Sequence, residues 1–169
     1  MTKCYNCRQA KMKVRRETYE YDLAGLPYPV VLLNVPVQRC PKCEEHAVTI
    51  PDLEGLHLRL ALDIVSAPRL LLPEEIRFLR KTMDWTAEEM GRIVGVDVKT
   101  ISRWENGKQR LGPVAERLLR LIVRDLEPRP VEWVSTVFSE LAAKGPAKTR
   151  RTPPPVRFKT TAKGWERAA

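Results

Sequence analysis

The residues with the clearest chemistry in this sequence are its four cysteines, which form two pairs of the type CxxC. A CxxC turn directs two thiolates towards one metal ion, and two such turns supply the four soft ligands that suit tetrahedral zinc. The predicted ligands are Cys4, Cys7, Cys40 and Cys43. Because four thiolates complete the coordination shell, we expect one structural Zn²⁺ per chain and no open position for catalysis.

Other roles for the cysteines stay open. A redox CxxC of the thioredoxin type needs one pair in a βαβ context, whereas this chain has two matched pairs. Disulfides are disfavoured in the cytoplasm, where we expect the chain to reside because it lacks a signal-like apolar region and any membrane-spanning apolar run. His46 follows Cys43 by three residues and is an alternative ligand, but we expect an ordinary surface histidine.

A second stretch, KTISRWENGK at residues 99–108, has the pattern of a short helix with two unlike faces. Ile101 and Trp104 form a face for packing, and Gly107 can adopt the left-handed conformation that ends a helix. The other face would enter the major groove of DNA. The predicted base-reading residues on that face are Val98, Lys99, Ser102 and Arg103.

Polar residues around this helix are suited to the phosphate backbone of DNA. Asn106, Lys108 and Arg110 follow the helix, and Thr86 stands at the start of the preceding one, where anions are favoured. These four are the predicted phosphate contacts. The alternative is a helical bundle with a solvated charged face, and the capping pattern of the neighbouring segment argues against it.

That neighbouring segment contains the signals of a helix-turn-helix. Pro73 suits the first turn of a helix, and TAEE at residues 86–89 has the form of a capping box. Gly95 permits a tight turn, and Asp97 caps the next helix. Gly-Pro at residues 112–113 begins a further helix that would close the bundle.

The cysteine pairs must be positioned by the chain between them. Residues 12–21 and 30–37 have the pattern of strands, and residues 52–66 that of a leucine-rich helix. A metal ion would join the ends of this small sheet, which has too few residues for a large core. The exposed edges of such a sheet can accept a strand from a partner.

The chain has 30 basic and 21 acidic residues, a net charge of +9, which favours an anionic partner such as double-stranded DNA. The expected fold class is α+β, with a zinc-stapled β-rich domain before an all-α helix-turn-helix bundle of the phage-repressor type. A basic tail, predicted to be disordered, would serve as a DNA-binding arm or as a solubilising segment. The predicted segments are a zinc-binding domain at 1–66, a linker at 67–72, a helix-turn-helix domain at 73–124, an extra helix at 125–143 and the tail at 144–169.

Two families resemble parts of this chain. Residues 74–123, with ISRWENGK, resemble the Xre/Cro-type DNA-binding domain, and CYNC…VPVQRCPKC resembles the YgiT-type zinc finger. Together, in this order, they resemble an MqsA-type antitoxin of a type II toxin–antitoxin system. The resemblance implies a zinc domain that holds a cognate toxin, commonly an mRNA-cleaving ribonuclease, and a homodimer that represses its own promoter at a palindromic operator. It also implies that Lys99 and Arg103 are the main base readers.

Two competing functions are weighed against this one. A stand-alone zinc-containing helix-turn-helix regulator without a toxin would have the same motifs. An enzyme would need a nucleophile–base set, a phosphate-binding glycine loop or an open metal site, and the sequence offers none of these patterns. We therefore expect a regulator that is not an enzyme.

Overall fold

The computed structural model describes residues 3–22, 24–125, 152–161 and 164–168. The chain forms two compact units that differ in secondary structure. The first, here called the cysteine unit, comprises residues 1–24, 28–56 and 154–169. The second, the helical unit, comprises residues 25–27 and 57–153. In the described part of the chain, no helix has the length and apolar character needed to cross a bilayer.

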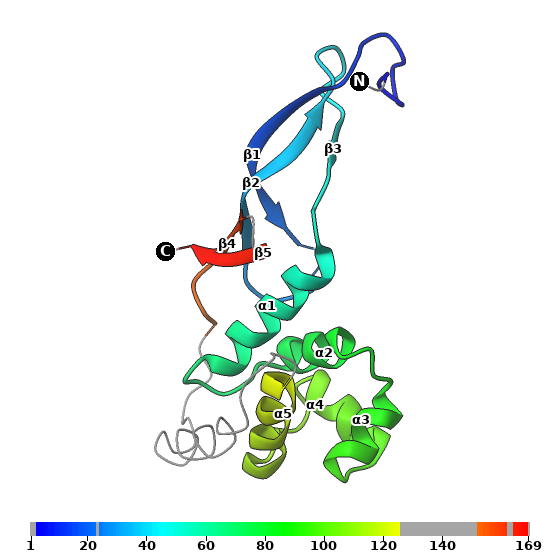
Figure 1. The fold of residues 1–169 in the computed structure, drawn as a ribbon. Coiled ribbons are helices and arrows are strands. Elements are labelled where there is room, and N and C mark those ends of the chain that lie inside the picture. Colours follow the sequence, from blue (N-terminus) through cyan, green and yellow to red (C-terminus); the bar gives the residue numbers. More distant parts are fainter. Residues whose placement is uncertain (1–2, 23, 126–151, 162–163, 169) are drawn as a thin grey trace. The chain divides into compact units, whose positions relative to one another are not determined.

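The cysteine unit is built on a long antiparallel pair, β1 (Lys13–Tyr21) and β2 (Val30–Arg39) (Figure 1). Their register runs from Lys13 opposite Arg39 to Tyr21 opposite Val30, so both strands predicted from the sequence are confirmed. A short third strand, β3 (His46–Val48), pairs with the last residues of β2 and had not been predicted.

Side chains of β2 alternate between the core and the surface, as a strand buried on one face requires. Val30 and Leu32 are buried, and after a shift of one residue so are Val35 and Val37. The shift falls at Asn34, whose φ of 62° lies in the left-handed region that asparagine tolerates. This irregularity keeps the apolar face of β2 towards the core along the whole strand.

A hairpin from the C-terminal end of the chain completes the sheet. It comprises β4 (Val156–Thr161) and β5 (Gly164–Ala168), and β4 pairs in parallel with β2. The strand order is β1-β2-β4-β5, so β4 lies between β2 and β5 (Figure 1). The prediction of a disordered tail over residues 144–169 is therefore wrong for these strands. Apolar side chains at alternate positions of β4 are buried in the sheet, which outweighs the turn-forming prolines that precede it.

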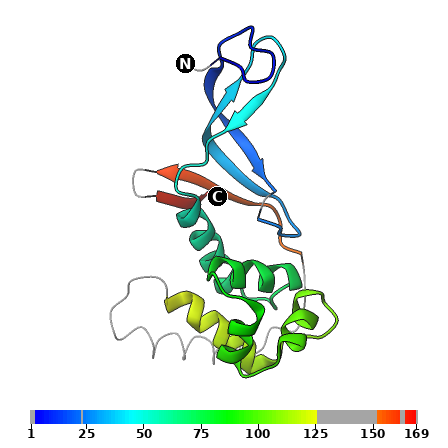
Figure 2. The same cartoon turned by 90° about the vertical axis from the view of Figure 1, so that its right-hand side faces the viewer.

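Within its described residues, the helical unit contains most of one long helix and four shorter helices, each close to its predicted position (Figure 2). They are α1 (Leu53–Ser66), α2 (Pro73–Thr82), α3 (Ala87–Val94), α4 (Val98–Glu105) and α5 (Pro113–Asp125). The first turn of α1 belongs to the cysteine unit. The core includes fully buried Ile76, Leu79, Met90, Ile101 and Leu119. The extra helix predicted at residues 125–143 falls beyond Asp125 outside the described residues.

Helix caps fix the start of α3 and of α4. The hydroxyl of Thr86 accepts a hydrogen bond from the amide of Glu89 at 3.1 Å, and the Glu89 carboxylate accepts from the Thr86 amide at 2.7 Å. Asp97 accepts from the amide of Thr100 at 2.9 Å. The capping box and the aspartate cap that the sequence predicts are both confirmed.

The connection between α3 and α4 depends on two glycines. Gly95 ends α3 with a φ of 74°, which costs a glycine little. A Cβ on Gly91 would lie 2.6 Å from the carbonyl oxygen of Val96, so a larger residue would push the turn away from α3. The two helices consequently meet across a three-residue turn.

A buried arginine joins α5 to the end of α1. The guanidinium of Arg120 donates to the carbonyl oxygens of Val65, Ala67 and Arg69 at 2.6, 3.1 and 2.5 Å, and to the Glu116 carboxylate at 2.8 Å. The Val65 carbonyl lies in the last turn of α1, where carbonyls have no helical partner, and Ala67 and Arg69 follow directly after the helix. The segment predicted to be a linker is thus bonded into the helical unit.

The boundary between the two units accordingly falls inside α1, between Leu56 and His57. The predicted boundary at residue 66 lies ten residues further along the chain. The difference arises because the sequence shows where α1 ends but does not show that Arg120 of α5 binds the carbonyls at that end.

Candidate functional site

Strand pairing brings the two CxxC turns to one end of the sheet. The first turn precedes β1 and the second follows β2. Because the strands are antiparallel, with Lys13 opposite Arg39, the residues before one strand lie beside the residues after the other. The long sequence gap between the cysteine pairs is therefore closed by the sheet itself.

The two CxxC turns have the same backbone construction. The amide of Arg8 donates to the carbonyl of Cys4 at 3.0 Å, and the amide of Glu44 donates to that of Cys40 at 3.2 Å. Arg8 and Glu44, each four residues after the first cysteine of a pair, have φ values of 55° and 59°. In each turn the left-handed residue redirects the chain, so that both thiols point to the same side.

The four cysteine sulfurs form one cluster. All Sγ atoms lie within 4.8 Å of one another, and Cys4–Cys43 and Cys7–Cys40 are each separated by 3.6 Å. Four sulfurs about 2.3 Å from a central zinc would be about 3.8 Å apart in a regular tetrahedron, so the donor set fits that geometry. Cys4 and Cys40 are buried with Met12 in a small apolar cluster. The predicted ligands therefore converge on a possible metal site.

The thiols of this cluster differ in acidity. The amide of Lys42, 3.4 Å from the Cys40 sulfur, lowers the pKa of Cys40 to about 6. The amide of Glu45 acts to lower the pKa of Cys43, but burial and the neighbouring thiols raise it to about 12. Cysteine binds a metal as its thiolate, so binding of a divalent metal would release the protons that remain on this cluster.

Polar side chains hold the two turns together around the cluster. Tyr5 donates from its hydroxyl to the Glu45 carboxylate at 3.3 Å and to the carbonyl of His46 at 3.1 Å. The amide of Asn6 donates to the other Glu45 oxygen at 3.1 Å. His46, the alternative ligand, is exposed on β3 and is not part of the metal-ligating group. Glu45 is a site residue that the sequence analysis missed.

The exposed side of α4 presents the residues predicted to read bases. Ile101 and Trp104 are buried, which confirms the predicted packing face. The four predicted base-reading residues are all exposed: Val98, Lys99, Ser102 and Arg103. The indole N–H of Trp104 has no hydrogen-bond partner within the described ranges, so this ring is held by packing alone.

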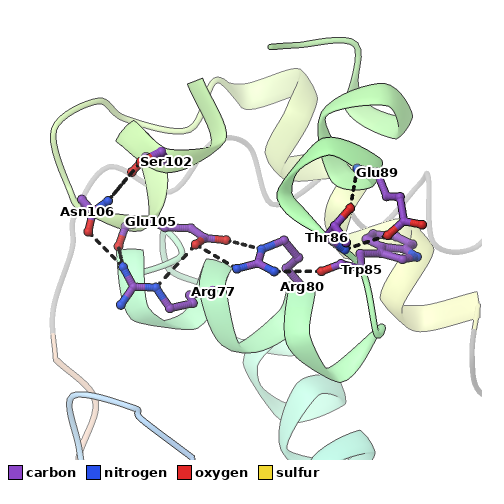
Figure 3. Close-up of polar contacts among 8 residues, drawn as sticks. All are labelled: Arg77, Arg80, Trp85, Thr86, Glu89, Ser102, Glu105 and Asn106. Carbon is purple, nitrogen blue, oxygen red and sulfur yellow. Dashed lines mark hydrogen bonds and ion pairs between the residues drawn. The ribbon is translucent and has the colours of Figure 1, made fainter. Parts of the chain in front are cut away.

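A buried ionic network fixes the C-terminal end of α4 against α2 (Figure 3). The Glu105 carboxylate accepts from Arg80 at 2.6 Å and from Arg77 at 3.4 Å. Arg80 also donates to the carbonyl of Trp85 at 2.8 Å, and its hydrogen bond with Glu105 raises its pKa. The network ties α4 to α2 and to the loop before α3, and the sequence analysis missed it. The sequence pattern that could have indicated this network is the presence of charged residues at helical positions that face the core.

Asn106 is bonded within the same network. Its amide donates to the carbonyl of Ser102 at 2.7 Å, and its side-chain oxygen accepts from Arg77 at 3.0 Å (Figure 3). Asn106 therefore caps the end of α4 as well as facing solvent. The other predicted phosphate contacts, Thr86, Lys108 and Arg110, are also exposed.

Comparison with known proteins gives the family. No curated protein matches the chain significantly. The family model described as the antitoxin component of bacterial toxin–antitoxin systems, MqsA, matches residues 2–129. That range contains all four clustered cysteines and the helices from α1 to α5. The chain belongs to the MqsA antitoxin family.

Proposed function

We propose that this protein is a zinc-containing antitoxin in which the cysteine unit sequesters a cognate toxin and the helical unit represses transcription. The observation that carries the proposal is the family match across both the cysteine cluster and helices α3 and α4. An antitoxin of this kind acts by binding and is not an enzyme. It works in the cytoplasm, where both its operator and a toxin directed at mRNA would be found.

One Zn²⁺ per chain would be held by the four clustered cysteines in a structural role. The donor set supports this assignment, because four sulfur ligands in tetrahedral proximity favour zinc and leave no position for substrate. Its contribution would be to fix the end of a small sheet. Metal analysis of protein purified without chelator should give one zinc per chain, and a zinc-free folded protein would contradict the assignment.

The exposed side of α4 would enter the major groove of operator DNA. Arg103 has the forked donor geometry that suits guanine, and Lys99, Val98 and Ser102 would complete base recognition. Thr86, Asn106, Lys108 and Arg110 would contact phosphates and set the register. A homodimer would place two such helices on one side of a palindromic operator, with half-sites a whole number of helical turns apart.

Two substitutions separate base reading from phosphate contact. Arg103→Ala should weaken binding to the operator by about 1–3 kcal/mol and relax preference at one base pair. Lys108→Ala should weaken operator and random DNA alike and reduce the salt dependence by about one unit of slope. Fluorescence anisotropy on both DNAs at several salt concentrations measures the difference. Equal losses by both variants on both DNAs would contradict these roles.

The cysteine unit would bind the toxin. Its net charge is low, because its twelve basic and eight acidic residues leave +4 and four thiolates with one Zn²⁺ reduce this to about +2, so the electrostatic attraction to DNA is small. The test is calorimetric titration of the full chain with the protein encoded by the adjacent reading frame. Binding that survives Arg103→Ala supports separate toxin and DNA surfaces.

The same titration distinguishes the alternative, a stand-alone regulator with no toxin. That alternative would be favoured if the protein encoded by the adjacent reading frame did not bind this chain while operator binding was intact. Fragments cut at residue 66 are unsuitable for either test, because the cut separates Arg120 from the carbonyl of Val65 and the C-terminal hairpin from its sheet. Full-length variants retain both.

A further inference from the structure

The hairpin β4–β5 lies beyond the residues that match the family model, yet it is part of the cysteine unit. Its ladder with β2 pairs Val30 with Val156 and continues to Leu33 opposite Lys159. The amide of Val156 also donates to the carbonyl of Pro29 at 3.1 Å. The C-terminal segment therefore occupies a strand site that the family-matched part of the chain provides.

Two aromatic side chains anchor the hairpin. Phe158 is completely buried, and Trp165 is 7% exposed. The indole N–H of Trp165 donates to the carbonyls of Pro51 and Asp52 at 3.0 and 3.1 Å. Buried aromatic anchors combined with a main-chain ladder are the features of strand-addition sites in protein complexes.

The other long strand edge of this sheet has a different character. In the described residues, β1 pairs with no strand besides β2, and its exposed positions include Arg15, Arg16 and Glu20. Charged side chains on an edge strand discourage strand addition. The edge of β2 at residues 30–33 is instead apolar, and within the sheet β4 is what covers it. Of these two edges, the one suited to strand addition is therefore the β2 edge at residues 30–33, which β4 covers.

We propose that the β2 edge at Val30–Leu33, with the carbonyls of Pro51 and Asp52, is the docking site for a β-hairpin of the toxin, and that the C-terminal hairpin of this chain occupies it in the free antitoxin. This proposal rests on the proposed function, because it names the surface on the cysteine unit that the toxin uses. The hairpin is then an internal competitor that sets the apparent affinity for the toxin.

The competition follows from the pairing. The β2–β4 ladder is parallel and joins four residue pairs, whereas β1 and β2 are joined along nearly their whole length. A short parallel ladder is the weaker of the two, so β4 can leave while β1 stays. If the hairpin occupies the site for about 90% of the time, the apparent toxin affinity is about tenfold below the intrinsic affinity.

The experiment uses the full chain and two probes, a labelled synthetic peptide of residues 152–169 and the protein encoded by the adjacent reading frame. Phe158→Asp should release the chain's own hairpin, because it places a charge at a fully buried position. Lys159→Gln is the matched control, since Lys159 is exposed on the same strand and its ion pair with Glu166 is half-exposed. Zinc content and circular dichroism check that both variants stay folded.

Phe158→Asp should bind each probe about tenfold more tightly than the wild type, and Lys159→Gln should bind like the wild type. Tighter peptide binding with unchanged or weaker toxin binding would overturn the proposal, because the site would then serve the chain's own hairpin alone. Failure of the variant to bind the peptide more tightly would overturn it as well. If the adjacent product binds no version of the chain, the proposed antitoxin function itself fails.

A second experiment tests the proposal if the Phe158→Asp variant does not fold. Excess peptide added to the wild-type chain should compete with the toxin and lower its apparent affinity. Trp165→Phe keeps the aromatic ring and removes the donor to Pro51 and Asp52, so it should raise toxin affinity by a few-fold. No competition and no gain with Trp165→Phe would place the toxin elsewhere on the protein.

Discussion

Glu105 is the residue on which the position of α4 depends most directly, because its buried carboxylate holds two arginines of α2. Removing one partner of a buried ion pair leaves the other charge uncompensated and costs about 3–5 kcal/mol. Glu105→Ala should therefore lower the free energy of unfolding of the helical unit by about 3 kcal/mol. Urea unfolding followed by circular dichroism measures this.

The matched comparison is Arg77→Ala, because the Arg77 side chain is 41% exposed and that of Arg80 is 15% exposed. A partly solvated ion pair contributes less, so this change should cost about 1 kcal/mol. Similar losses in Arg77→Ala and Glu105→Ala would show that burial does not set the strength of this network.

Trp104 gives a second prediction at the scale of one residue. Its ring is 3% exposed, and its N–H has no partner in the described part of the chain. Trp104→Phe should cost less than about 1.5 kcal/mol, because it removes volume but no hydrogen bond, whereas Trp104→Ala should cost about 3–5 kcal/mol. Thermal unfolding of both variants tests this, and an equal cost would indicate that the indole N–H is bonded.

At the scale of elements, the caps of α3 and α4 predict an acid-sensitive helical unit. Hydrogen bonds from Thr86 lower the pKa of Glu89 from its usual 4.5, and those from Thr100 lower the pKa of Asp97 from 3.8. A lowered pKa means that the folded state favours the charged carboxylate. The stabilisation is therefore complete above the usual pKa values and is lost as pH falls from about 4.5 through the lowered ones.

The urea midpoint of the helical unit, measured between about pH 6 and pH 3, should fall more steeply for the wild type than for Glu89→Gln. The glutamine retains an acceptor for the Thr86 amide but has no proton to gain in this range. Superimposable pH profiles would mean that the Glu89 cap does not contribute to the acid response.

The elements differ in how far the sequence predicts them. Residues such as Thr86, Gly95 and Asp97 specify α3 and α4 because caps and turns are local interactions. The hairpin β4–β5 was missed even though VRFKTT alternates apolar and polar residues, because its pairing partner lies more than 100 residues earlier in the chain. The hydrogen bonds of Arg120 at the end of α1 were missed for the same reason, because their carbonyl acceptors lie more than 50 residues earlier in the chain.

At the scale of the whole molecule, the two units should respond differently to loss of metal. Cys40→Ser removes one of four clustered ligands, and the cysteine unit should then unfold, because the end of its small sheet is no longer held. The helical unit contains no cysteine and should keep its helices and its operator binding. Limited proteolysis and DNA titration of the full-length variant measure the two outcomes.

Lys42→Ala is the control for this substitution, because it changes the same turn without removing a ligand. The amide that bonds the Cys40 sulfur is retained in this variant, so the metal site should be unaffected. Loss of operator binding in Cys40→Ser, or an unchanged resistance of the cysteine unit to protease, would contradict the independence of the two units.

The discontinuous course of the chain through the cysteine unit has a consequence for protein synthesis. β2 leaves the ribosome 117 residues before β4, since β2 ends at Arg39 and β4 begins at Val156. At typical rates of translation this interval lasts on the order of 10 s, and the helices α1 to α5 are made within it. The nascent antitoxin therefore exposes the edge at Val30–Leu33 while its own hairpin does not yet exist. If that edge binds the toxin, a newly made chain captures toxin most readily before its synthesis is complete.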